Sequence, residues 1–116
     1  MTKNLVQYIV VRGDLKWPTG ALIGNACHAS VAAIAKHMST DPETQEYVSQ
    51  LDSMTKVVLK ADSADVLQDV CHRLDQNNVE YYLWREQPED IITCVATTPR
   101  PRDLLKPLLS HLKLFK

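Results

Sequence analysis

The segment Leu5–Val11 is the feature of this sequence that most constrains its fold. The segment is rich in β-branched residues, almost continuously apolar, and followed directly by Arg12-Gly13-Asp14. A strand that is covered on both faces of a sheet has this pattern, whereas a strand with one face in water alternates between apolar and polar residues. The segment is too short to cross a membrane and lacks the flanks of a signal peptide. We therefore expect a central strand, with helices on both faces of its sheet.

The rest of the chain supplies those helices and further strands. Small and apolar residues recur at helical spacing from Ala21 to about Met38, with Leu22, Ala26, Ala29 and Ala33 on one stripe. The other expected elements are a short polar surface helix introduced by Asp41-Pro42 and running through Glu46–Leu51, a strand at Lys56–Lys60, a helix opening at Asp62–Asp65, strands at Val79–Trp84 and Ile91–Ala96, and a last helix after Pro99 that carries Leu104, Leu105, Leu108, Leu109 and Leu112 toward the core. This order predicts an α/β fold, a three-layer α/β/α sandwich with a mixed sheet.

Composition limits the functions to be considered. The 116 residues fit one domain, residues 1–116, and their net charge of −1 gives no general preference for nucleic acid. The cysteines Cys27, Cys71 and Cys94 have neither disulfide nor zinc-site spacing, so we expect free thiols in a reducing compartment, the cytoplasm. No metal, no cofactor and no membrane contact are expected.

Four motifs, in this order, resemble one known family. They are Val10–Lys16 with Gly20 and Cys27-His28-Ala29, then Lys56–Lys60, Thr93–Pro99 and His111–Leu114. Their sequences and separations are similar to those of the type-2 peptidyl-tRNA hydrolases of archaea and eukaryotes, over nearly the whole chain. The resemblance implies a four-stranded sheet in the order 2-1-4-3, with strand 4 antiparallel and a closing helix at His111–Leu114. It also implies a metal-independent enzyme that cleaves the ester between a peptide and the 3′ ribose of tRNA, so that peptidyl-tRNA is the expected partner.

The chain departs from the family pattern near the first helix and the last turn. Typical members have a lysine, a glutamine and an Asp-Ala-Gly turn where this sequence has Ala21, Asn25 and Glu86-Gln87-Pro88. Two interpretations therefore stay open. The first is a peptidyl-tRNA hydrolase, and the second is a catalytically weak or inactive member that binds tRNA or a protein partner. A homodimer is a candidate assembly under either interpretation.

The candidate catalytic residues are His28, Asn25, Glu86 and Thr93. Asn25 and His28 share a helical stripe, which places them above the same part of the sheet. Ester hydrolysis needs an oriented water, a proton acceptor and donors to the developing oxyanion. We assign His28 to the water, Asn25 to a carbonyl or phosphate oxygen, Glu86 to the position of the family's aspartate and Thr93 to the reacting carbonyl. The alternatives are a packed histidine, a solvated carboxylate in a charged turn, and a threonine that simply favours a strand.

The candidate tRNA-binding residues are Lys16, Arg12, Trp17 and Gly20. The Lys16–Gly20 turn presents backbone N–H groups at a helix N-terminus, where anions bind, and Arg12 and Lys16 add positive charge. Trp17 beside these cations is suited to stack on a terminal base. As alternatives, Lys16 is a solvated loop residue and Trp17 packs on Leu15 or the edge of the sheet. We expect Trp84, in an apolar run, to be structural.

Overall fold

The computed structural model describes residues 4–116. Its elements, in chain order, are β1 (Leu5–Arg12), α1 (Thr19–His37), α2 (Pro42–Val48), a 3-10 turn η1 (Leu51–Ser53), β2 (Thr55–Ala61), α3 (Ala64–Gln76), β3 (Tyr81–Glu86), β4 (Ile91–Thr97), β5 (Arg100–Pro101), α4 (Arg102–Leu109) and β6 (Lys113–Leu114). Within this part of the chain, none of the helices has the length and apolar character needed to cross a membrane.

The strands form one mixed sheet with β1 in its interior. β1 pairs in parallel with β2 and antiparallel with β4, and β3 and β4 form an antiparallel pair, as expected from their short connection. The predicted mixed α/β architecture is thus confirmed. The prediction of four strands is wrong, because the short strands β5 and β6 extend the sheet, whereas the four long strands keep the predicted neighbours. The order is β3-β4-β1-β2-β6, and β5 pairs with β1 beyond the end of β4.

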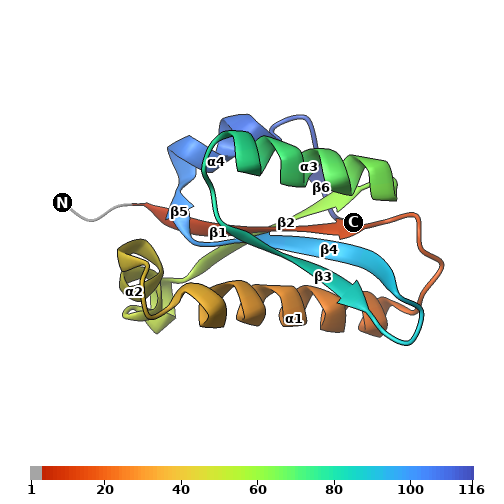
Figure 1. Ribbon diagram of the computed structural model, residues 1–116, viewed down its shortest axis with the longest axis horizontal. Coiled ribbons are helices and arrows are strands. Elements are labelled where there is room, and N and C mark those ends of the chain that lie inside the picture. The colour runs from red at the N-terminus through yellow and green to blue at the C-terminus, as the bar shows by residue number, and fades with distance from the viewer. Residues whose placement is uncertain (1–3) are drawn as a thin grey trace.

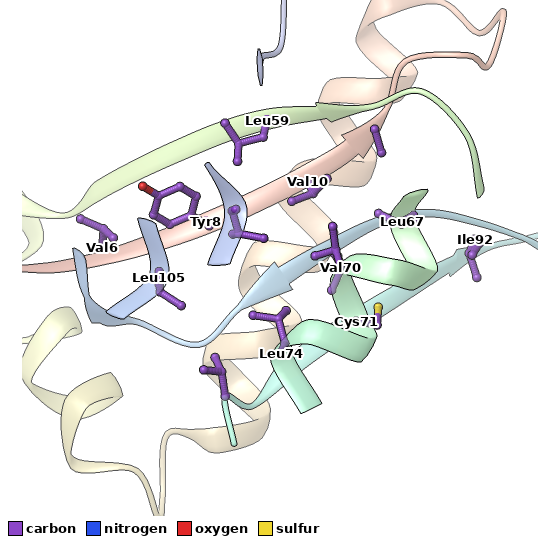
Figure 2. Packing of buried hydrophobic residues seen from close by; sticks show 14 residues of the cluster. Val6, Tyr8, Val10, Leu59, Leu67, Val70, Cys71, Leu74, Ile92 and Leu105 are labelled. Carbon is purple, nitrogen blue, oxygen red and sulfur yellow. The ribbon is translucent and has the colours of Figure 1, made fainter. Parts of the chain in front are cut away.

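Helices cover both faces of this sheet, with α1 and α2 on one side and α3 and α4 on the other (Figure 1). Alternate residues of β1 enter two separate cores. Val6, Tyr8 and Val10 pack with Leu67, Val70, Leu74 and Leu105 of α3 and α4 (Figure 2), whereas Ile9 and Val11 pack with Ala29 and Ala33 of α1. Because both of its faces are buried, β1 needs apolar residues at consecutive positions, which explains the pattern of Leu5–Val11.

The C-terminal segment differs from its prediction. The closing helix expected at His111–Leu114 is wrong, since α4 ends at Leu109 and Lys113–Leu114 form β6 against β2. Leu105 and Leu109 enter the core as expected, but Leu104 is 41% exposed. Adjacent residues of a helix point about 100° apart, so Leu104 and Leu105 cannot face the same core.

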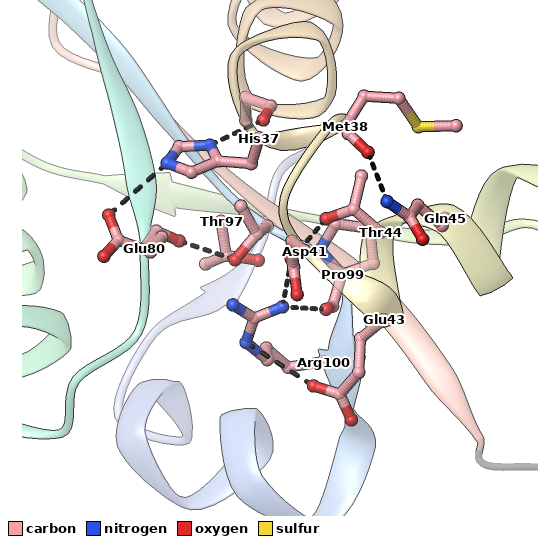
Figure 3. Close-up of polar contacts among 12 residues, drawn as sticks. His37, Met38, Asp41, Glu43, Thr44, Gln45, Glu80, Thr97, Pro99 and Arg100 are labelled. Carbon is pink, nitrogen blue, oxygen red and sulfur yellow. Dashed lines mark hydrogen bonds and ion pairs between the residues drawn. The ribbon is translucent and has the colours of Figure 1, made fainter.

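Helix α2 begins as expected, but it ends earlier and lies deeper than expected. It begins at Pro42 after the N-cap residue Asp41 and ends at Val48, and its Thr44 and Tyr47 are buried. An ion cluster joins it to β5, because Arg100 donates to the Asp41 carboxylate at 2.7 Å and lies 3.6 Å from that of Glu43 (Figure 3). Burial raises the pKa of Asp41, but hydrogen bonds from Thr44 and Arg100 outweigh burial, and the net pKa is lowered.

Candidate active site

The predicted site residues come from segments that meet at one end of the sheet. Figure 1 shows that the connection after β1, the first turn of α1 and the β3–β4 turn lie at the same end of the molecule. Arg12 ends β1, and Glu86 ends β3. Lys16 and Trp17 lead into α1, and Gly20 lies in its first turn. The fold therefore gathers residues that are far apart in the sequence into one region.

Asn25 and Thr93 are joined directly and are both buried. The Thr93 hydroxyl donates to Asn25 Oδ1 at 2.8 Å, and Asn25 Nδ2 donates to the backbone oxygen of Ala21 at 2.7 Å. The exposed fractions are 3% for Asn25 and 0% for Thr93. This bond fastens the first half of α1 to β4. A direct contact of either side chain with a substrate, as predicted, requires that the bond opens in the complex.

An irregularity in the β3–β4 ladder brings Thr93 to the helix. Trp84 pairs with Cys94 and Arg85 with Ile92, so Thr93 has no partner of its own. Such an extra residue breaks the alternation of a strand, and Thr93 and Cys94 both contact Asn25 of α1. Burial raises the pKa of the Cys94 thiol to about 12. This thiol therefore stays protonated at neutral pH and is a poor nucleophile.

His28 and Glu86 are linked through Trp84. The imidazole of His28 stacks on the indole of Trp84 with ring centroids 4.6 Å apart and an interplanar angle of 4°. Trp84 Nε1 in turn donates to Glu86 Oε1 at 2.8 Å. Trp84 is half-buried, while His28 is exposed. No local pattern of residues indicates that Trp84 belongs to the site, because its partner His28 is 56 residues away, in another element.

Arg12 is held by partners inside the protein. Its guanidinium makes two hydrogen bonds to the Asp14 carboxylate, at 3.0 and 2.7 Å, and donates to the backbone oxygen of Ile92 at 3.1 Å. The bond from Arg12 lowers the pKa of Asp14, so the pair is charged at neutral pH. This arrangement ties the end of β1 to β4 and offsets the Arg12 charge that was predicted to bind phosphate.

The remaining predicted tRNA-binding residues surround the start of α1. Lys16 and Gly20 are exposed and Trp17 is half-buried. The first turn of α1 contains no acidic residue, and no side chain caps its N-terminus. Free N–H groups at a helix start attract anions, and Lys16 adds a cation in the same loop. Within residues 4–116, no three His, Cys, Asp or Glu side chains come together as a metal ion would require.

Gln7 is a fully buried polar residue that the sequence analysis did not single out. Its Nε2 donates to the backbone oxygens of Ser30 and Thr97, and its Oε1 accepts from Ser30 Oγ and Lys56 Nζ. Gln7 thereby connects β1 to α1, β2 and β4 at the end of the sheet away from the β3–β4 turn. A single polar residue within the apolar segment Leu5–Val11 is the signal that identifies it.

Comparison with known proteins gives the family of this chain. The family model described as peptidyl-tRNA hydrolase PTH2 matches residues 5–115. The chain belongs to this family. A Mus musculus protein named "Putative peptidyl-tRNA hydrolase PTRHD1" is 44% identical over 97% of this chain and 83% of its own length. A Thermococcus onnurineus protein named "Peptidyl-tRNA hydrolase" is 30% identical over 93% of this chain and 95% of its own.

A solved structure agrees with the fold of this PTH2 chain. It is that of Atu0240, a protein of unknown function from Agrobacterium tumefaciens, with a TM-score of 0.63 and 10% sequence identity over 99% of this chain and all of the other. At this identity the similarity shows the fold alone. The resemblance to type-2 peptidyl-tRNA hydrolases that the motifs indicated is thus confirmed by the family match and by the relatives, and not by this structure.

Proposed function

We propose that this PTH2 chain hydrolyses the ester between a peptide and the 3′ ribose of tRNA. The observation that carries the proposal is the arrangement of His28, at the middle of α1, with Trp84 and Glu86 near the end of β3. It links an exposed imidazole to a carboxylate through one indole, and the helix that carries the imidazole begins with an N-terminus suited to phosphate. Membership of the peptidyl-tRNA hydrolase family supplies the substrate class.

In this proposal, His28 orients the attacking water or accepts its proton. Imidazole is the most frequent general base in enzymes, and it presents its ring nitrogens at its edge. Glu86 holds Trp84 through the indole N–H, and Trp84 supports one face of His28. The Asn25–Thr93 bond fixes the helix that carries His28 to β4. The position of His28 on α1 is therefore supported by contacts from β3 and from β4.

In the same proposal, the tRNA backbone binds at the start of α1. The uncapped N–H groups beside Gly20 and the exposed Lys16 attract phosphate, and Trp17 lies in the same loop. Arg12 contributes less than expected, because Asp14 already binds its guanidinium. A cytoplasmic location, one domain over residues 1–116 and a homodimer stay predictions from the sequence.

The test is release of tRNA from a defined peptidyl-tRNA, with and without a chelator. We expect release that the chelator does not change. His28→Ala should lower the rate by about 10²–10⁴-fold, the usual contribution of a general base, with little change in melting temperature. The matched control is His72→Ala, which removes another exposed histidine, on α3 in the opposite helical layer. Absence of release with the enzyme in excess over the substrate would refute the proposal.

A second candidate function is binding of tRNA without turnover. The observation that favours it is that the polar groups of Asn25 and Thr93 bond to each other in a buried position, where water and substrate do not reach them. Titration with uncharged tRNA separates the two functions. Tight binding by a protein that releases no peptide would support the binding module, whereas release of peptide would exclude it.

A further inference from the structure

Aromatic rings from two elements form a row where β3 meets α1. The Trp84 ring stacks on His28 of α1 on one side and lies 6.2 Å from the Tyr82 ring, tilted by 37°, along β3. Lys36 Nζ, from the last turn of α1, lies 5.7 Å from the centroid of the Tyr82 ring. β3 is the edge strand of the sheet at this side, and no further strand within residues 4–116 pairs with its outer edge.

Trp84 covers one face of the His28 ring, and the residue stays exposed to solvent. Trp84 is the one ring that stacks on His28 within residues 4–116, and His28 is an exposed residue. The indole below it is held in orientation by the bond from Nε1 to Glu86. A ring that is already supported in a parallel stack loses little freedom when a third ring is added. The outer face of His28 therefore offers a prepared surface for a flat aromatic ligand.

We propose that this outer face of His28 stacks on an unpaired base at the 3′ end of tRNA. The inference rests on the proposed function, since it names the part of the substrate that this region holds. Proteins bind single-stranded nucleic acid through aromatic platforms accompanied by cations, and here Lys36 is the cation beside the row. The base of the terminal nucleotide carries the ribose with the ester. Stacking of that base brings the ester to the edge of the imidazole, where the nitrogens of His28 lie.

The experiment uses the protein with its native sequence as the parent protein. The probes are an uncharged tRNA and the same tRNA without its single-stranded 3′ nucleotides, at one fixed ionic strength. We expect the complete tRNA to bind about 5- to 100-fold more tightly than the truncated one, from the strength of base–aromatic stacking.

Two substitutions at the same position distinguish stacking from polar contact. His28→Ala should abolish the preference for the complete tRNA, and His28→Phe, which keeps an aromatic face, should retain it within about threefold. His72→Ala is the matched control and should bind like the parent protein. Equal affinity for the two tRNAs, absence of binding, an unchanged preference in His28→Ala, or loss of the preference in His28→Phe would each overturn the inference.

Peptide release is measured on the same proteins and reports separately on the proposed function. A parent protein that prefers the complete tRNA but releases no peptide refutes the hydrolase and supports the stacking surface. A parent protein that releases peptide but shows no preference refutes the stacking surface alone. The expected His28→Phe protein binds the complete tRNA and has lost release, because phenylalanine offers a face for the base and no nitrogen for the water.

Discussion

Replacing Thr93 by valine tests how α1 is held against the sheet. Valine has nearly the shape of threonine, so the change removes the hydroxyl with little change in packing. Asn25 Oδ1 then loses the donor that lies 2.8 Å away, in a residue that is only 3% exposed. A buried acceptor without a partner costs about 1–3 kcal/mol. We expect the free energy of unfolding to fall by that amount, and the melting temperature by about 4 °C per kcal/mol in a chain of this length.

The assay is equilibrium unfolding in urea, followed by fluorescence and circular dichroism. The midpoint should fall while the slope m keeps its value, because the surface exposed on unfolding does not change. Thr40→Val is the matched control, since Thr40 is an exposed turn residue, and it should change stability by less than about 0.5 kcal/mol. The double variant with Asn25→Ala should show a coupling energy of at least about 0.5 kcal/mol, as expected for residues in contact.

The same measurements show which result would contradict this reasoning. If Thr93→Val is as stable as the parent protein, and its effect adds to that of Asn25→Ala without coupling, the hydrogen bond does not anchor α1. If stability is unchanged while peptide release per folded molecule is lost, the Thr93 hydroxyl contacts the substrate, as the sequence predicted. A destabilised protein with normal release per folded molecule would instead restrict Thr93 to a structural role.

Two further predictions concern cysteine reactivity and acid stability. In the native protein we expect iodoacetamide at pH 8 to modify Cys27 alone, because burial raises the pKa of Cys71 to about 11 and that of Cys94 to about 12. The number of modified cysteines is counted by mass spectrometry. Modification of a second cysteine as fast as that of Cys27 would contradict this prediction. Arg100→Met should cost about 2–4 kcal/mol by leaving the Asp41 carboxylate without its guanidinium. Because the pKa of Asp41 is lowered on folding, its contribution is present above about pH 4 and is lost on acidification, so the parent protein should lose stability below that pH more steeply than Arg100→Met. Identical pH profiles of the two proteins in urea unfolding would refute the assignment.

The sequence by itself determined the elements whose pattern is local and long. β1 could be predicted because burial on both faces requires consecutive apolar residues, and the stripe of α1 through Ala29 and Ala33 because a helix repeats every 3.6 residues. The motifs around His28 and Thr93 also indicated the family, which the match over residues 5–115 confirmed. These features depend on residues that are close together in the chain.

Tertiary structure alone decided the rest. Strands of two residues, such as β6, have no periodicity of their own and exist because β2 offers a partner. The pairing of Trp84 with Cys94 and of Arg85 with Ile92 leaves Thr93 as the extra residue that reaches Asn25, and such a register is set between strands. Trp84 could not be assigned to the site for the same reason, because its role depends on stacking with His28, which lies on α1. Contacts between distant segments follow from packing in three dimensions, which no local pattern of the sequence encodes.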